Sequence, residues 1–305
     1  MRIKIICIYL LFFPCLLQAQ QVGDRGYQAE VSNPTWEKGQ GPLVLVDEAH
    51  NNYHTMSARY KPFAEVLRAD GFRVAANTQP FSNGSLPKDA VLVISNALNH
   101  KNLKNWKLPT PSAFTKDEIK VVHAWVKQGG DLFLIVDHMP MPGAASDLAH
   151  AFGVTFSNGF AMTPNEGGGI LVFSREAGTL PKSPIIEGRS ERERVDSVAS
   201  FTGSAFRIHP DVAAKPILIF PSGVVSLESS VAWEFTEGTP QVMVTGWLQG
   251  AILECGKGRV AIFGEAAMFT AQIQNSQRKL GLAHPVAKQN QTFLLNLMHW
   301  LTGLI

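Results

Sequence analysis

Histidine and carboxylate side chains gather at three points of the sequence, each directly after a short apolar segment. The first point is residues 47–54, which read DEAHNNYH; the second is Asp137-His138 and the third is Gly264-Glu265. Imidazole nitrogens and carboxylate oxygens are the groups that bind divalent metal ions and transfer protons in proteins. These three points are therefore the candidates for chemistry.

A metal site is the first chemistry that these residue types allow. Zinc or manganese held by imidazole and carboxylate groups lowers the pKa of a bound water molecule and so generates a nucleophile. Proton transfer without a metal is the second, with His138 next to an acid as the general base. The predicted metal ligands are Asp47, His50, His54 and Glu265. The predicted catalytic residues are His138, Asp137 and Glu48, and the predicted substrate-binding residues are Asn51, Asn52 and Asn96.

Two other interpretations of the same residues stay open at this point. In one, they bind a glycan or a partner protein without catalysis; in the other, they cap helices and satisfy one another's hydrogen bonds. No ligand motif of fixed spacing decides between them, because His50 and His54 are four residues apart but lie in a predicted loop. Replacing His138 distinguishes an enzyme from a binding module, since it abolishes turnover in the first and only weakens binding in the second.

The apolar segments before these residues have the pattern of strands buried on both faces. We expect strands at 42–46, 72–75, 90–94, 132–136 and 259–263. Apolar residues at helical spacing predict helices over 57–70, from Thr115 to Gly129, over 144–152 and over 292–301. The Thr115-Lys116-Asp117-Glu118 capping box begins the second helix. This alternation predicts an α/β fold with an open parallel sheet and helices on both faces, in which ligands bind beyond the carboxyl ends of the strands.

Three other segments complete the predicted organisation. Residues 20–41 are a polar N-terminal arm, and residues 42–305 form a single α/β domain. Within that domain, residues 153–256 consist of short apolar segments separated by Gly, Pro and Ser, which predicts a strand-rich insertion. Residues 1–19 combine Arg2 and Lys4, an apolar stretch and a Leu-Gln-Ala cleavage site, the pattern of a secretory signal peptide.

The predicted leader implies a periplasmic or secreted protein with no membrane span in the mature chain. A lipid anchor at Cys15 is disfavoured because Phe13-Pro14 precedes it instead of small residues. Cleavage also leaves Cys255 as the lone cysteine, so we expect no intrachain disulfide.

Composition excludes several classes of protein. The full chain has 305 residues, 45% of them hydrophobic and 17% charged, which is enough apolar material for a full core. Removal of the leader leaves 25 Lys and Arg against 25 Asp and Glu, a balance that argues against nucleic-acid binding. The sequence lacks a phosphate-binding G-x-x-x-x-G-K-[ST] loop, which argues against an ATPase. We expect a small polar molecule or a glycan as the ligand.

Two aromatic features bear on that ligand. Tryptophan indoles form stacking surfaces for sugars, and the candidates are Trp106, Trp125, Trp233 and Trp247. Trp125 follows helical core spacing, so we expect it in the core, and we expect the same of His299 on the apolar C-terminal helix.

Three segments carry a resemblance to a known superfamily: VDEAHNNYHT at 46–55, WVKQGGDLFLIVDHMPMPGAA at 125–145 and GKGRVAIFGEAAMFTAQ at 256–272. They resemble an uncharacterised bacterial family of the glutamine-amidotransferase-like superfamily. They are also distantly similar to trehalose-utilisation-like proteins and to domains of the gliding-motility and intraflagellar-transport type. The resemblance implies a flavodoxin-like sheet with its site at the strand ends.

The same comparison argues against one activity, the hydrolysis of glutamine. The true amidotransferases carry a nucleophilic cysteine in the turn that here reads Val136-Asp137-His138-Met139. This chain has no cysteine in that turn, so glutamine hydrolysis through a thiolate is not expected. The sequence hypothesis is an exported, metal-assisted hydrolase of a small polar or carbohydrate-like substrate. The alternative is a non-catalytic glycan- or partner-binding module of the same fold.

Overall fold

A computed structural model describes residues 21–164 and 169–305 of the chain. The predicted signal peptide, residues 1–19, lies outside the described residues. Within the described part, no helix combines the length and the apolar character needed to cross a membrane.

A run of five parallel strands forms one half of the main sheet, in the order β3-β2-β4-β5-β15. Numbered along the chain, this order is 2-1-3-4-5. All five strands were predicted, and the buried, apolar character that identified them is clearest in β4, whose residues are all buried. The strands are β2 (Leu43–Asp47), β3 (Arg73–Asn77), β4 (Ala90–Ser95), β5 (Asp131–Ile135) and β15 (Gly258–Phe263).

The other half of the sheet is antiparallel, which corrects the prediction of a wholly parallel sheet. Strand β14 (Leu248–Cys255) joins β15 through a tight turn at Gly256, and a hairpin makes its two strands antiparallel. Beyond β14 the sheet continues through strands of the predicted insertion, so that nine strands form one mixed sheet. These strands are β10 (Phe206–Ile208), β6 (Val154–Phe156) and β11 (Ala214–Ile219).

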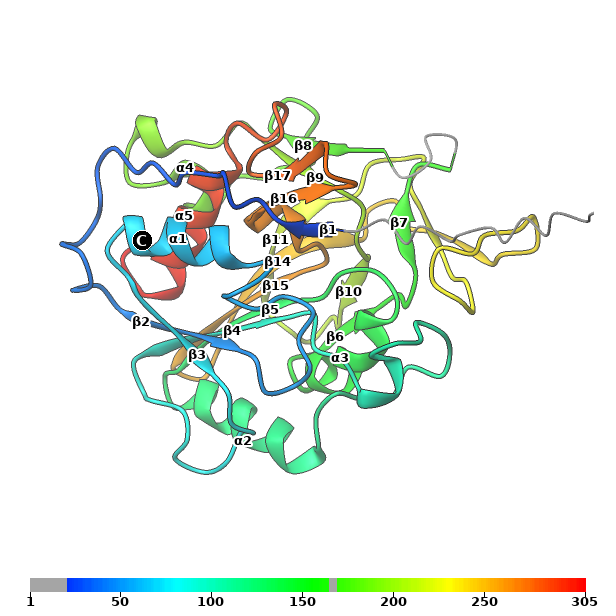
Figure 1. Ribbon diagram of the computed structural model, residues 1–305, viewed down its shortest axis with the longest axis horizontal. Helices are drawn as coiled ribbons and strands as arrows, with labels where there is room; N and C mark the ends of the chain where they lie inside the picture. Colours follow the sequence, from blue (N-terminus) through cyan, green and yellow to red (C-terminus); the bar gives the residue numbers. More distant parts are fainter. Residues whose placement is uncertain (1–20, 165–168) are drawn as a thin grey trace, which may run out of the picture.

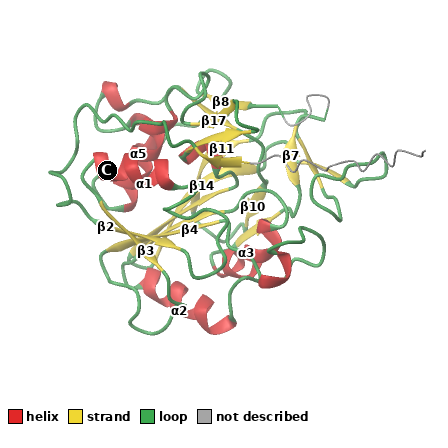
Figure 2. Ribbon diagram, viewed as in Figure 1, coloured by secondary structure: helices red, strands yellow, loops and turns green. Residues whose placement is uncertain are grey.

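Helices cover both faces of the sheet, as predicted, although there are few of them (Figures 1 and 2). On one face, α1 (Lys61–Ala69) and α5 (Asn290–Leu301) bury their apolar residues in one core cluster, and the short α4 (Pro184–Glu187) lies against α5. On the other face, α2 (Lys116–Lys127) and α3 (Met141–Ala151) contribute to a second cluster. Helix α2 begins with the predicted capping box of Thr115 and Glu118.

Short strands and 3-10 turns make up the rest of the insertion and the rim of the sheet. Their bounds are β1 (Gln21–Gly23), β16 (Ala271–Gln274) and β17 (Arg278–Gly281) in one small sheet, β7 (Phe160–Met162), β12 (Val225–Leu227) and β13 (Gln241–Met243) in a second, and β8 (Leu171–Ser174) with β9 (Ser197–Ser200) in a third. The 3-10 helices are η1 (His100–Asn102), η2 (Glu191–Glu193) and η3 (Ala267–Phe269).

The N-terminal arm is tied to the domain rather than loose. Strand β1 pairs with β16, and the ring of Trp36 packs edge-on against Phe72. Gly71 ends helix α1 with a φ of +100°, and a Cβ atom there would collide with the backbone of Trp36. The arm therefore depends on a glycine at the end of α1 for its close approach.

Candidate functional site

A pocket of about 130 Å³ lies where the neighbouring parallel strands β5 and β15 end. Asp137 and His138 reach it from the segment after β5, and Glu265 from the segment after β15. The remaining lining residues are Gln21, Ile170, Phe201, Thr202, Trp233, Ala267, Gln274, Arg278 and Leu280.

His138 is held in one tautomer and one orientation. Its Nδ1 lies 2.9 Å from the carbonyl oxygen of Met139, which can only accept, so Nδ1 carries the hydrogen. In the neutral ring, Nε2 therefore holds the lone pair, and it lies 4.0 Å from Oδ1 of Asp137. The ring stacks on Phe160 with centroids 4.5 Å apart and meets the Trp233 indole edge-on at 4.7 Å. This nitrogen is available as a base.

Glu265 plays a different part from His138, because its carboxyl group is buried and already bonded. Its two oxygens accept hydrogen bonds from the backbone N–H groups of Ala267 and Met268, at 2.7 and 2.6 Å. Burial, and then the negative charge of Asp137, raise the pKa of Glu265 well above its ordinary value, although these N–H groups oppose the shift. The raised pKa favours the protonated form of the Glu265 carboxyl group.

His54 does not line the pocket but contacts Asn96, which holds one of the pocket residues. Its Nδ1 lies 3.1 Å from both the Ser95 hydroxyl and the Asn96 amide, and its Nε2 lies 3.2 Å from the Gln272 amide nitrogen. Burial, followed by the charges of Arg59 and His138, lowers its pKa well below the ordinary histidine value, so the ring is neutral. Asn96 in turn accepts a hydrogen bond of 2.8 Å from the backbone N–H of Asp137. The chain from His54 through Asn96 fixes the backbone of the pocket.

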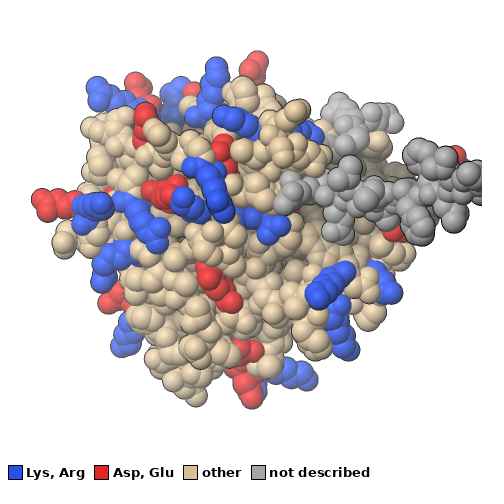
Figure 3. Space-filling model, in the orientation of Figure 1, with Lys and Arg blue, Asp and Glu red and all other residues tan. Residues whose placement is uncertain are grey.

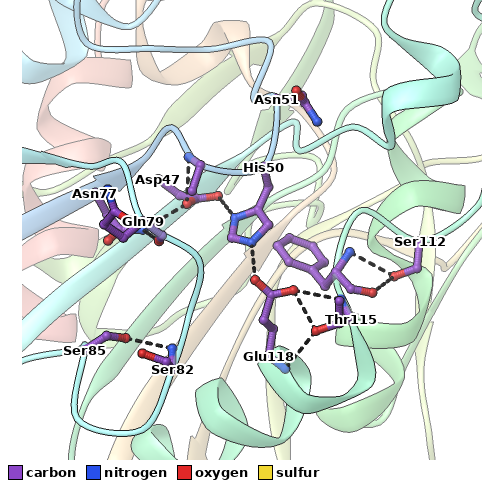
Figure 4. A network of polar contacts seen from close by, with 12 residues as sticks. Asp47, His50, Asn51, Asn77, Gln79, Ser82, Ser85, Ser112, Thr115 and Glu118 are labelled. Carbon is purple, nitrogen blue, oxygen red and sulfur yellow. Dashed lines mark hydrogen bonds and ion pairs between the residues drawn. The ribbon is translucent and has the colours of Figure 1, made fainter.

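Asp47 and His50 belong to a second, closed network (Figure 4). Nδ1 of His50 lies 2.8 Å from Asp47 and Nε2 lies 2.9 Å from Glu118, so both ring nitrogens face carboxylates. Burial lowers the pKa of His50, but the hydrogen bonds and charges of the two acids outweigh it and leave that pKa raised. The doubly protonated ring thus joins the end of β2 to the first turn of α2. Phe81 and Phe114 pack against it at centroid distances of 4.5 and 4.7 Å.

The four predicted metal ligands are not brought together. Across residues 21–164 and 169–305, no three His, Cys, Asp or Glu side chains form a group that could hold a metal ion. The physical reason is that each is bonded elsewhere: Asp47 and His50 to one another, His54 to amides and a hydroxyl, and Glu265 to backbone N–H groups. The sequence placed them correctly after strands but not around one point.

Four further candidates lie outside the lining of this pocket. Glu48 accepts a hydrogen bond of 2.7 Å from the backbone of Met56 and does not line the pocket. Asn51 donates to the carbonyl of Leu98 at 3.2 Å and, in Figure 4, points away from the His50 network. Asn52 is buried and accepts from the backbone of His50 at 3.1 Å, and Asn96 reaches the pocket only through Asp137. All four shape the loops around the strand ends.

The tryptophan candidates divide into two groups. Trp125 is 8% exposed and lies in the core, as predicted, and Trp247 lies under the Arg207 guanidinium. Trp106 and Trp233 instead lie beside His138, with ring centroids 6.0 and 4.7 Å from the imidazole. Only these two belong to the site.

Several lining residues were not predicted from the sequence. Gln274 and Arg278 come from the β16–β17 hairpin, whose polar residues hide its strand pattern, and Gln21 comes from β1 beside it. His299 is buried as predicted, and its Nε2 lies 2.7 Å from Asp70, away from the pocket.

Comparisons with known proteins identify similarities of fold. No family model matches the chain, and no match was found among curated proteins. Among solved structures, the "mmIFT52 N-terminal domain" is 13% identical with a TM-score of 0.55, over 85% of this chain and 97% of that one. A "Cytoplasmic Protein STM3548 from Salmonella typhimurium" is 14% identical with a TM-score of 0.47, over 85% and 98% of the chains. A "putative thua-like protein" from Bacteroides uniformis is 12% identical with a TM-score of 0.44, over 90% and 95%.

The first of these is of a kind expected from the sequence, since it is an intraflagellar-transport-type domain. At 13% identity the first shows the fold alone.

Proposed function

We propose that the pocket at the ends of β5 and β15 binds a small, hydroxyl-rich molecule such as a sugar derivative, and that His138 and Asp137 hydrolyse a bond in it. One observation carries this proposal: Nδ1 of His138 is engaged by a carbonyl group, so Nε2 keeps its lone pair beside Asp137 in a lined pocket. An imidazole nitrogen with a free lone pair in a pocket can accept a proton from a water molecule.

The class of ligand follows from the groups around that base. Gln21, Thr202 and Gln274 offer amide and hydroxyl groups that both donate and accept hydrogen bonds. Trp233 offers a flat apolar ring on the same pocket. A sugar ring presents hydroxyl groups at its edge and C–H groups on its face, and so complements both kinds of lining.

The proposed steps use residues of this chain alone. Nε2 of His138 takes a proton from a water molecule as the water oxygen bonds to the reacting carbon. Oδ1 of Asp137, 4.0 Å from Nε2, stabilises the imidazolium that forms. As the C–O bond to the leaving group breaks, the same proton passes from Nε2 to the leaving oxygen. Glu265 takes no proton in this scheme; it holds the η3 turn in place through Ala267 and Met268.

A binding module without catalysis is the second candidate function, and the burial of Glu265 favours it. This carboxyl group is 1% exposed and both oxygens are bonded to the backbone, so the pocket has one acid–base pair rather than two. Such a pocket would bind a glycan through the same residues and release it unchanged.

Turnover measurements distinguish these candidates. The purified chain is tested against chromogenic glycosides and sugar esters, alongside His138→Ala, Asp137→Asn and the control His209→Ala, whose side chain is 63% exposed. A hydrolase loses at least about 100-fold in kcat/KM in the first variant, which is the usual contribution of a general base. The control keeps its rate. Sugar binding with no turnover supports the module, and turnover that survives His138→Ala refutes the proposed base.

We also propose that the fold is flavodoxin-like, within the glutamine-amidotransferase-like superfamily, and that the chain is exported. The strand order 2-1-3-4-5 supports the first, since it is the order of flavodoxin-like sheets. The leader pattern at 1–19 supports the second. Mass spectrometry of the protein recovered from a bacterial periplasm tests the export: we expect a mature N-terminus at Gln20, and an intact N-terminus in the cytoplasm would contradict it.

A further inference from the structure

An exposed aromatic surface continues outward from the pocket. It consists of Trp233 and Phe235, which are 51% and 37% exposed and lie on the segment between β12 and β13. We call this pair the aromatic ledge. Trp233 itself lines the pocket, so the pocket and the ledge are one continuous surface.

We propose that the aromatic ledge binds the second unit of a sugar chain whose terminal unit occupies the pocket. This inference rests on the proposed function and goes further by naming the substrate class: an oligosaccharide or polysaccharide end rather than a free monosaccharide.

The backbone at Trp233 is the first observation behind the ledge. Its φ is +67°, a left-handed conformation that a bulky side chain adopts only at a cost. Such strain persists where the surroundings impose it, and it is concentrated at functional positions. Here the strained residue carries a large indole that is half exposed to solvent, so the conformation does not serve to bury the ring.

The anchoring of the segment is the second observation. Before Trp233, the backbone of Ala232 donates to the carbonyl of Trp106, and Leu108 donates to the carbonyl of Ser230, at 2.8 and 2.9 Å. Beneath the ledge, the buried ring of Phe160 lies 4.6 Å from Trp233 and 5.1 Å from Phe235. The two exposed rings therefore rest on a fixed base, which lowers the conformational entropy that a ligand must remove.

Charged groups of both signs line the pocket beside the ledge, because Asp137 and Glu265 face it together with Arg278. In Figure 3, Lys and Arg side chains alternate with Asp and Glu on the face displayed, without a large area of one sign. Aromatic rings beside a pocket of amide, hydroxyl, carboxyl, imidazole and guanidinium groups suit a chain of alternating C–H faces and hydroxyl edges, since each of these polar groups can hydrogen-bond a sugar hydroxyl. A protein partner is the competing occupant of an exposed apolar surface, and the test includes it.

The experiment measures how affinity depends on the length of the sugar chain. Native gel electrophoresis in the presence of soluble glucan, xylan and galactomannan identifies a polysaccharide that retards the chain. Calorimetry then gives the affinity for its monosaccharide, disaccharide and trisaccharide. The variants are Trp233→Ala, Phe235→Ala and, as a matched exposed apolar control, Leu304→Ala near the C-terminus, which Figure 1 places on the other side of the molecule.

We expect the wild-type chain and Leu304→Ala to bind the disaccharide more tightly than the monosaccharide. The ratio of the disaccharide affinity to the monosaccharide affinity falls about 10-fold in Phe235→Ala. Trp233→Ala loses about 30-fold in affinity for the disaccharide, the size of effect typical of an aromatic ring that a bound ligand covers.

Three results would overturn the inference. If the chain binds a monosaccharide and a second sugar unit adds no affinity, the role of the aromatic ledge is refuted and the proposed function stands. If the wild-type chain binds no sugar, both the role of the ledge and the proposed function are refuted. Self-association that light scattering detects in the wild-type chain and not in Trp233→Ala, without sugar binding, assigns the surface to a protein contact instead.

Discussion

Replacement of His50 by alanine is expected to lower the stability of the fold without removing a catalytic group. The ring bridges Asp47 and Glu118, whose side chains are 0% and 11% exposed, so its loss leaves two buried carboxylates without a counter-charge. Breaking a buried ion pair in this way costs about 3–5 kcal/mol. The removed ring also leaves a cavity beside Phe81 and Phe114.

That cost translates into a measurable change in melting temperature. For a chain of this length, about 2 °C is lost per kcal/mol, so the melting temperature should fall by roughly 6–10 °C. Calorimetry gives this shift, and urea unfolding gives the free energy after coincident fluorescence and circular-dichroism transitions have been checked. His209→Ala is the matched control, because its exposed ring should change stability by less than about 0.5 kcal/mol.

If the free energy of unfolding falls by less than about 1 kcal/mol in His50→Ala, the reasoning is refuted, since the bridge would then contribute no more than an exposed ion pair. A loss of sugar turnover in His50→Ala at unchanged stability would refute it in a second way. That result would show that His50 takes part in the reaction, as the sequence hypothesis expected.

Three other predictions concern the His50 network and Gly71. The folded-state pKa of His50 lies above 6.5 and that of Glu118 below 4.5, so the stability contributed by His50 is lost as pH rises and that contributed by Glu118 is lost as pH falls. The difference in unfolding free energy between wild type and His50→Ala, measured by urea unfolding, should therefore be largest between pH 4.5 and 6.5. A maximum above pH 8 would contradict this prediction. Elemental analysis of protein purified without chelator should find no zinc or manganese that His50→Ala removes, because both ring nitrogens are bonded to carboxylates; stoichiometric metal lost in that variant would contradict the assignment. Gly71→Ala should destabilise the fold by about 1–3 kcal/mol in urea, because a left-handed backbone meets Trp36 there, and an unchanged midpoint would show that the arm moves aside.

Local patterns were sufficient for the elements that position the site. The parallel strands were recognised as short, mainly apolar runs, of which β4 is buried throughout, and the capping box of Thr115 and Glu118 marked the start of α2. The placement of Asp137, His138 and Glu265 at one edge followed as well, because parallel neighbouring strands end together. These are consequences of spacing along the chain, which the sequence displays directly.

The partners of the polar groups were decided by tertiary structure. His50 meets Glu118, 68 residues away, and His54 meets Gln272, 218 residues away; neither pairing leaves a trace in local spacing. The antiparallel half of the sheet, the polar β16–β17 hairpin and the approach of Trp233 to His138 likewise depend on how distant segments meet. Sequence by itself therefore determined which residues reach the strand ends. Only the packing of loops decided which of them remain free for a ligand, because a hydrogen bond made to another side chain removes a group from the site.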